Sequence, residues 1–406
     1  MTALSGTIPV FASLEGAPIA LKAWILGLLE NMGMPEPFLM LVSIQLSILG
    51  FFSVFLLLFV LASWFERKIL ARIQNRRGPN RVGPAGLLQP IADGIKMLTK
   101  EDIVPVAADK VLHACAPVLI ILPAFLAMAI LPYGKNMTPV ELEVGILLFF
   151  AVSTATELAV FMAGWASLNK FSMLGAMRAV AQILSYELPL ILAATSVVMI
   201  TGSLSLTAMV EAQGGYLLGI LPNWHVFTPW GFAAFAVFFI SALAESNRTP
   251  FDLPEGESEL VAGHMTEYSG FKYALFFISE YLGLYVVCGF AVALFLGGWQ
   301  APLPFLTFIP SWIWFFAKIL CLVFVAMWFR GTFPRVRVDH LMNFAWKFLI
   351  PLGVMVLVSA AVWHLAGRGP LGWILSLPPL LIPYWLMARA YGRNYDAGGR
   401  VYRFAE

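Results

Sequence analysis

The feature that most constrains this chain is a series of apolar stretches about as long as a bilayer is thick. A membrane-spanning α-helix needs about 20 predominantly apolar residues. Eight stretches come close to or exceed this length, at Phe38–Trp64, Leu112–Leu131, Val144–Ala166, Leu174–Ile200, Thr228–Ala244, Tyr273–Leu296, Phe308–Phe329 and Phe344–Leu365. A ninth, Leu371–Ala390, contains Pro378, Pro379 and Pro383. The sequence therefore predicts an all-α polytopic membrane protein with eight core helices and a ninth helix near the C-terminus.

Composition agrees with this fold class. Hydrophobic residues make up 60% of the chain and charged residues 12%, against about 45–50% and about 25% in soluble domains. A soluble fold could not bury so much apolar surface, so the solvent for most of the chain is lipid. The net charge of +2 gives no indication of nucleic-acid binding.

The distribution of lysine and arginine predicts the orientation. When the predicted connections are assigned to alternate sides, only Lys22, Lys135 and Arg368 lie on one side and Lys318 lies within a span, which leaves 21 of the 25 basic residues on the other side. Because basic residues concentrate in cytoplasmic loops, the rich side is cytoplasmic. We therefore expect a periplasmic N-terminus, a cytoplasmic C-terminus and, with no signal or transit peptide pattern, a bacterial inner membrane.

This orientation divides the chain into three regions. Residues 1–37 form a periplasmic segment in which Ile19–Leu29, too short to span, is expected at the membrane interface. Residues 38–366 form the membrane domain, with cytoplasmic loops at 65–111, 167–173, 245–272 and 330–343. Residues 367–406 form a C-terminal extension that contains the ninth helix.

The first cytoplasmic loop is expected to be structured. Phe65, Ile69 and Ile73 continue the first helix beyond the membrane. Gly-Pro pairs then impose turns. Leu88, Ile91, Ile95 and Leu98 follow at helical spacing, which predicts an amphipathic helix on the membrane surface.

Cofactor motifs are missing from the sequence. Cys115, Cys288 and Cys321 are isolated, and the five histidines are scattered, so an iron–sulfur, zinc or haem site is not expected. No glycine-rich nucleotide motif occurs. We expect this chain to bind no NAD, flavin, iron–sulfur cluster or metal.

Charged residues at membrane depth are the first candidate site. Glu157, Glu187, Glu280 and Lys318 fall within predicted spans, and Glu245 lies at the inner end of the fifth. Each such charge costs about 2.5–3.5 kcal/mol on the most lenient scale, so these side chains should face protein or water. One interpretation is structural, with Glu–Lys pairs joining helices. The other is a proton path, because carboxyl groups in apolar surroundings can exchange protons near neutral pH.

The cytoplasmic loop at 245–272 is the second candidate. It contains six acids on a side that is otherwise basic, namely Glu245, Asp252, Glu255, Glu257, Glu259 and Glu267. A solvated loop neutralised by basic neighbours is one interpretation. The apolar residues Phe251, Leu253, Leu260 and Val261 favour a packed loop instead.

The third candidate is a set of cytoplasmic arginines near tight turns, Arg72, Arg76, Arg330, Arg335 and Arg337. Such residues often only fix topology or contact lipid headgroups. Docking to acidic partner surfaces or to the acidic loop is the alternative.

Four stretches resemble one known family. Glu66–Asp93, which begins E-R-K-I-L-A-R-I-Q-N-R-R-G-P, is similar to the first cytoplasmic segment of the quinone-chamber membrane subunit, the H subunit, of respiratory complex I, the proton-pumping NADH:quinone oxidoreductase. Leu174–Glu187 resembles its fourth span and Ala244–Gly263 its long acidic loop. Arg330–Lys347 resembles the segment after its seventh span. The resemblance runs in order from Phe38 to Pro351.

The resemblance implies a place in a larger enzyme. In that family, flavin and iron–sulfur centres of a peripheral arm oxidise NADH and reduce quinone, ubiquinone or menaquinone. The subunit similar to this chain forms much of the quinone tunnel, and its first cytoplasmic segment and acidic loop dock the peripheral arm. The implied partners are the quinone-module and iron–sulfur subunits, small membrane subunits, antiporter-like subunits and lipids, with no nucleic acid.

The resemblance also assigns residues. Those expected to line the quinone tunnel or hold its loops are Arg67, Arg72, Arg76, Asp93, Arg248, Arg330 and Arg335, and we add His264, at which the sequence departs from the family, to this set. Those expected in the acidic path toward the antiporter-like subunits are Glu157, Glu187, Glu245, Glu255, Glu257, Glu259 and Glu280, and we place Lys318 in the same proton path. Reduction of quinone would act on these acids through their protonation and hydration.

The sequence departs from the family after Val-Ala-Gly, where an aromatic residue is usual and this chain has His264 followed by Met265. His264 either makes an apolar tunnel wall polar or faces the surface. The run Trp165–Ser172 is also looser than the usual serine- and asparagine-rich version.

Two other functions are compatible with parts of the sequence. One is the equivalent subunit of a membrane-bound hydrogenase-type complex, and the intact Gln-Asn-Arg-Arg-Gly-Pro segment and acidic loop favour the quinone-reducing branch over it. The other is a stand-alone ion or solute transporter. Missing internal repeats and long docking-type loops weigh against a transporter.

Overall fold

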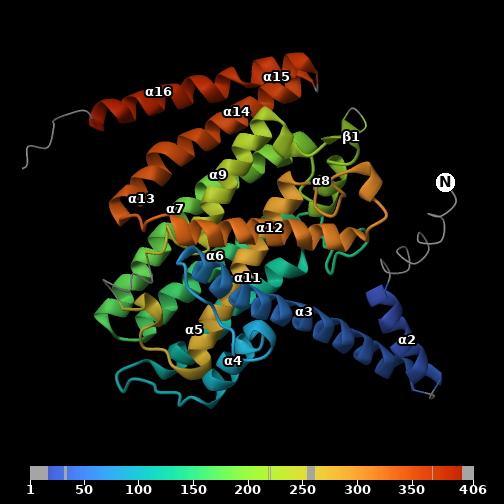
Figure 1. Ribbon diagram of the computed structural model, residues 1–406, viewed down its shortest axis with the longest axis vertical. Coiled ribbons are helices and arrows are strands. Elements are labelled where there is room, and N and C mark those ends of the chain that lie inside the picture. The colour runs from blue at the N-terminus through green and yellow to red at the C-terminus, as the bar shows by residue number, and fades with distance from the viewer. Residues whose placement is uncertain are drawn as a thin grey trace, which may run out of the picture.

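The computed structural model describes residues 17–31, 34–217, 219, 221–253, 261–367 and 369–395, and almost all regular structure in these ranges is helical (Figure 1). The long helices are α3 (Glu36–Ile73), α5 (Lys110–Ala129), α6 (Gly145–Ala166), α7 (Lys170–Thr201), α9 (Pro229–Glu245), α11 (Gly270–Phe295), α12 (Ser311–Thr332), α14 (Ile350–Ala366) and α16 (Pro378–Tyr395). The shorter helices are α2 (Ala17–Asn31), α4 (Gln89–Thr99), α8 (Leu206–Ala212), α13 (Val338–Phe344) and α15 (Pro370–Ser376). Single turns and the antiparallel pair β1 (Tyr216–Leu217) and β2 (Leu221–Pro222) connect them.

The predicted membrane helices are confirmed. Within the described ranges, eight helical segments are long and apolar enough to span a membrane, and the last of them is Leu371–Arg389. The fifth predicted stretch forms α9, a shorter apolar helix of 17 residues. The proline-rich ninth stretch forms α15 and α16, which are separated at Leu377. The predicted all-α polytopic fold is therefore confirmed, and the boundaries are close to those expected.

The helices pack around α11, whose second half from Tyr281 to Phe295 is almost entirely buried. Helices α5, α9 and α12 contact α11, while α6 packs between α5 and α7. Helix α14 covers α7 and α9, and α15 and α16 lie against α14 (Figure 1). Helix α3 contacts α11 and α12 through its later part and extends away from the bundle toward α2.

Local sequence explains where several helices begin and end. The Asp109 carboxylate accepts hydrogen bonds from the backbone amides of Val111 and Leu112 and so begins α5. Asn169 caps α7 in the same way through the amide of Phe171. Thr228 caps α9, with Pro229 at the first helical position.

The loop after the first membrane helix, residues 65–111, has the predicted helical structure. Helix α3 continues to Ile73, and the turn Pro84–Gly86 precedes the amphipathic helix α4. Gly86 has φ +78°, and a Cβ atom there would lie 2.3 Å from the carbonyl oxygen of Pro79, so this turn requires glycine. The apolar face of α4, formed by Leu88, Ile91, Ile95 and Leu98, is exposed in this chain.

The acidic loop is packed in its first part, as predicted. Phe251 and Leu253 are buried, whereas Val261 is exposed. Gln182 Nε2 of α7 donates hydrogen bonds to the carbonyls of Ala244 and Phe251 and thereby holds the loop against the bundle. Residues 254–260, which include Leu260, Glu255, Glu257 and Glu259, lie outside the described residues.

Candidate functional site

A buried ionic network lies at the end of the bundle where α3, α6, α9 and α12 finish, here called the loop end. Arg248, just after α9, places Nη1 2.8 Å from both carboxylate oxygens of Glu66 in α3. Its Nε lies 2.8 Å from Glu280 Oε1 in α11. Arg330 of α12 pairs with the same Glu66. Two acids and two arginines from four segments therefore neutralise one another.

Burial makes this pairing necessary. The side chains of Arg248 and Glu66 are each 3% exposed, and the guanidinium of Arg248 lies over the Tyr281 ring, 4.3 Å from its centroid. Burial would lower the pKa of Arg248, but Glu280 and Glu66 raise it above its ordinary value. The guanidinium thus stays charged, and the network is costly to break because the remaining partner would be a buried, unpaired charge.

A second group of acids lies between α6, α7 and the end of α9. Glu187 accepts hydrogen bonds from Ser153 and Thr154, at 3.3 and 3.1 Å. Glu157, one turn further along α6, is hydrogen-bonded to Glu187, and Glu245 lies within electrostatic range of both. Two carboxyl groups can share a hydrogen bond only when one of them carries the proton. The structure therefore brings three of the predicted acids together.

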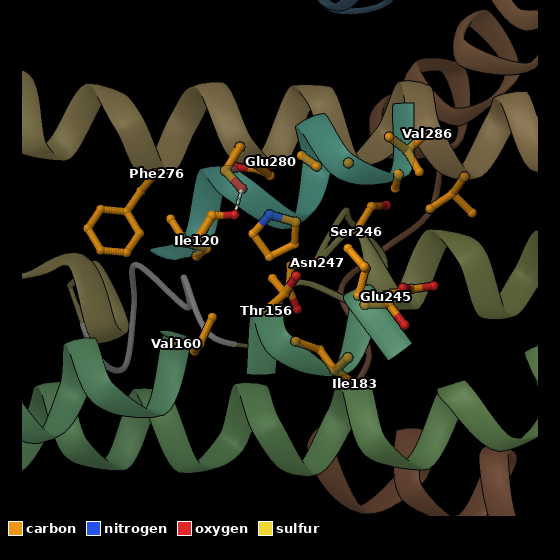
Figure 2. Close-up of a pocket in the computed structure, with 18 of the residues that line it drawn as sticks. Ile120, Thr156, Val160, Ile183, Glu245, Ser246, Asn247, Phe276, Glu280 and Val286 are labelled. Atoms are coloured by element: carbon orange, nitrogen blue, oxygen red, sulfur yellow. Dashed lines mark hydrogen bonds between the residues drawn. The ribbon is translucent and has the colours of Figure 1, made fainter. Parts of the chain in front are cut away.

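A cavity of about 100 Å³ separates these two groups (Figure 2). Its walls come from α5, α6, α7, α9, α11 and the turn Gly263–Met265. In Figure 2, Glu280 lies on one wall, and Glu245 and Thr156 lie on the opposite side. Most of the lining is apolar, and the polar residues are Ser153, Thr156, Glu245, Ser246, Asn247, His264, Ser279 and Glu280.

The cavity connects the two groups of charges. Glu280 belongs to the ionic network and to the cavity wall, and Glu245 belongs to the cavity wall and to the acid group. Among the described residues, neither Glu245 Oε2 nor Glu157 Oε1 has a hydrogen-bond partner, although both are buried. Buried polar atoms normally have a partner, which is often water. The arrangement can therefore hold water and protons between the loop end and the middle of the bundle.

The predicted tunnel residues of the first loop lie on the surface of the loop end. Arg67 Nη1 is 2.6 Å from Asp93 Oδ2 and joins α3 to α4. Partial burial would raise the pKa of Asp93, but Arg67 lowers it below its ordinary value. Arg72 lines an open groove of about 610 Å³ between α3 and α12, and Arg76 hydrogen-bonds Gln74.

Two further predicted residues are on the acidic loop or contact it. Arg335 Nη2 lies 2.7 Å from Asp252 Oδ2 and ties the segment after α12 to the loop. His264 is only 2% exposed, so the interpretation as a surface-facing histidine is wrong. Its ring and that of Phe276 form a T-shaped pair, with 5.6 Å between the ring centroids. The roles of Glu255, Glu257 and Glu259 fall outside the described residues and stay predictions.

Lys318 is not part of the acid group. Its Nζ donates hydrogen bonds to the carbonyls of Leu296, Gly298 and Gln300 at 2.7–2.8 Å, and it lies 4.1 Å from the Trp224 ring centroid. Leu296 follows Glu280 by 16 residues, which corresponds to about 24 Å along a helix. The structural interpretation with Glu–Lys pairs is therefore wrong for Lys318, whose ammonium group instead donates to the carbonyls at the C-terminal end of α11.

Sequence reasoning misses Glu66, Tyr281 and Gln182. Glu66 lies where an apolar span meets a basic segment, and the family motif that contains it assigns it no role. The signal is an acid in a position where topology favours bases. Tyr281 and Gln182 are recognised only through their tertiary partners.

Comparisons with known proteins show to which family the chain is similar. A model of the NADH dehydrogenase family matches residues 46–361. The chain is 48% identical over 312 residues to the NADH-quinone oxidoreductase H subunit of Dehalococcoides mccartyi strain CBDB1, and this match covers 77% of the chain and 83% of that protein. Proteins of the same name from Brevibacillus brevis and Geobacillus kaustophilus are 47% and 48% identical over 74% and 73% of this chain, and 87% and 86% of their own lengths.

The chain belongs to the family of NADH-quinone oxidoreductase H subunits.

Membership confirms the resemblance drawn from the four motifs. As a member of this family, the chain is a multi-pass protein of the bacterial membrane and a subunit of an enzyme complex. Other subunits of that complex are its partners. The family also favours the quinone-reducing complex over the hydrogenase-type complex and the stand-alone transporter.

Proposed function

We propose that this subunit forms part of the quinone-access tunnel and couples quinone reduction to proton movement through its buried acids. One observation carries the proposal. Charged and acidic side chains continue from the loop-end network through Glu280, the cavity and Glu245 to Glu187 and Glu157. So many buried ionisable groups in a membrane protein indicate a functional path.

The loop end is the side on which quinone would be reduced. The basic residues of the first loop and of the segment after α12 are exposed there, and they can bind acidic surfaces of the peripheral arm. We propose that this end is cytoplasmic, in accordance with the lysine and arginine distribution. Arg67, Arg72, Arg76, Asp93, Arg330 and Arg335 would then hold the loops that surround the quinone.

The position of Glu280 supports an electrostatic form of this coupling. Reduction of quinone adds negative charge or takes up protons near the network. Glu280 is shared between the network and the cavity, so a change there alters the charge that faces Glu245. Because these groups interact, protons redistribute over the whole set rather than leaving one residue independently.

Replacement of Glu187 by Gln tests this function in membranes that contain the assembled complex. The amide keeps the size and can still accept from Ser153 and Thr154, but it cannot carry a proton. We expect inhibitor-sensitive quinone reduction and NADH-driven proton pumping to fall, while NADH oxidation by an artificial electron acceptor is retained.

A matched control is Glu211→Gln, because Glu211 is exposed on α8 away from the acid group. This variant should behave as the wild type. Unchanged quinone reduction and pumping in Glu187→Gln would show that Glu187 only joins helices.

A further inference from the structure

His264 occupies a fixed position beside the cavity. The backbone of its turn lies directly against α7, where a Cβ atom on Gly175 would be 2.6 Å from the Cα of Gly263. Ser172 Oγ donates a hydrogen bond to the carbonyl oxygen of His264, and the ring packs edge-on against Phe276. Helices on two sides therefore set the direction of the imidazole.

The imidazole is buried, yet neither ring nitrogen has a hydrogen-bond partner among the described residues. It lines the same cavity as Glu245 and Glu280. A cavity needs only about 10–15 Å³ for one water molecule if polar partners are present. A cavity of about 100 Å³ is large enough for a short chain of water molecules. Three unpartnered polar atoms, both His264 nitrogens and Glu245 Oε2, can form hydrogen bonds with these water molecules.

We propose that His264 is a proton-carrying residue that exchanges protons with Glu245 and Glu280 through water in this cavity. The proposal rests on the coupling function proposed above and adds a residue to it. At this position the resemblance leads one to expect an aromatic residue, so the histidine is a feature of this chain. It extends the acidic path toward the loop at residues 261–269.

The chemistry requires no other reactant. A protonated Glu245 carboxyl passes a proton through water to one ring nitrogen and becomes a carboxylate, while the other ring nitrogen releases its proton through water to the Glu280 carboxylate. One proton enters the ring and one leaves it, and the reverse transfer restores the first tautomer. Burial lowers the pKa of His264 to about 4, so the ring is neutral at pH 7 and can both donate and accept.

The test compares His264→Phe with His264→Tyr in the assembled membrane complex. The two side chains differ by one hydroxyl, which can both accept and donate a proton. We expect quinone reduction with coupled pumping to fall roughly tenfold or more in His264→Phe, and His264→Tyr to retain most of it. Oxidation of NADH by an artificial acceptor should be unchanged in both. His364→Phe is the matched control, because His364 is exposed on α14.

Equal rates of quinone reduction in the wild type and in both variants would overturn the proposal. An equal loss of this activity in the Phe and Tyr variants would also overturn it, because it would indicate that His264 is needed only for packing. If the aromatic variants fail to assemble, His264→Gln and His264→Met repeat the comparison with smaller side chains, and Gln should retain more activity than Met. The Glu245→Gln variant distinguishes failure of the His264 proposal from failure of the proposed coupling function. If quinone reduction falls in Glu245→Gln but not in His264→Phe, only the role of His264 is refuted. If it does not fall in Glu245→Gln, the coupling function itself is refuted.

Discussion

Arg248 Nη1 lies 2.8 Å from both carboxylate oxygens of Glu66, although 182 residues separate them in the sequence. The same guanidinium contacts Glu280 through Nε. One cation thus joins α3, the start of the acidic loop and α11. It fixes the loop end of the bundle at the point where the cavity begins.

Replacement of Arg248 by Met should destabilise the folded protein by about 3–5 kcal/mol, because Glu66 and Glu280 would remain buried without their partner. The amount of assembled complex in membranes and its thermal unfolding midpoint measure this effect. Arg248→Lys should recover only part of the loss, since a single ammonium cannot contact both acids in the same geometry. Arg81→Met, at an exposed arginine of the same end, should change neither quantity. Normal assembly of Arg248→Met would contradict the role given to the network.

Replacement of Lys318 by Met should destabilise the complex by about 3 kcal/mol, because three carbonyls lose a charged hydrogen-bond donor. Pumping per NADH oxidised by the complexes that do assemble should stay normal. Thermal unfolding and the pumping ratio separate the two roles of this residue. A stable complex that reduces quinone but pumps few protons would instead place Lys318 in the proton path, as the sequence predicts.

The contact of Gly175 with the His264 turn predicts that Gly175→Ala costs about 1–3 kcal/mol, because the added methyl meets backbone that cannot move easily. Gly94→Ala is the control, since a Cβ atom there meets nothing within 4 Å in helix α4. That substitution should leave stability unchanged or raise it by up to about 1 kcal/mol. The thermal unfolding midpoints of the two variants test this prediction. Equal midpoints would mean that the turn is not packed as closely as the structure shows.

The lowered pKa of His264 in the folded protein predicts that the free energy of unfolding depends on pH. Its pKa in the folded protein is about 4, below about 6.5 in the unfolded chain, so the unfolded state binds more protons between these values. The stabilisation is complete above about pH 6.5 and is lost as the pH falls toward about 4. At about pH 5 the loss is about 2 kcal/mol. The unfolding midpoint should therefore fall less on acidification in His264→Phe than in the wild type, and identical slopes would contradict the prediction.

The elements of the fold are predictable from the sequence because each of them is a local pattern. Within the part of the chain that the structure describes, apolar length locates the eight segments able to span a membrane and the shorter apolar helix α9, and helical spacing locates α4. Pro378 occupies the start of α16, where no backbone donor is required, whereas Pro383 lies inside the helix. Of the three apolar loop residues that the structure describes, Phe251 and Leu253 are buried as predicted and Val261 is exposed.

The partners of the charged residues are not predictable in the same way. Residue type and depth identify Glu157, Glu187, Glu245 and Glu280. The cavity that lies between Glu280 and the group of the other three acids is formed by the packing of five helices, which no local pattern shows. Glu66 escapes sequence reasoning because its partner Arg248 is distant in the chain. Depth alone groups Lys318 with the acids, since both lie within spans, and depth does not show which helix end a side chain contacts.

The most direct test of the account is to measure the rate of quinone reduction, and the protons pumped per NADH oxidised, in complexes that carry Glu245→Gln. Glu245 lies on the cavity wall and within electrostatic range of Glu187 and Glu157, and the amide of Gln cannot carry a proton. The account predicts that quinone reduction and pumping fall roughly tenfold or more, with artificial-acceptor activity retained. A normal pumping ratio at a normal rate of quinone reduction would contradict it.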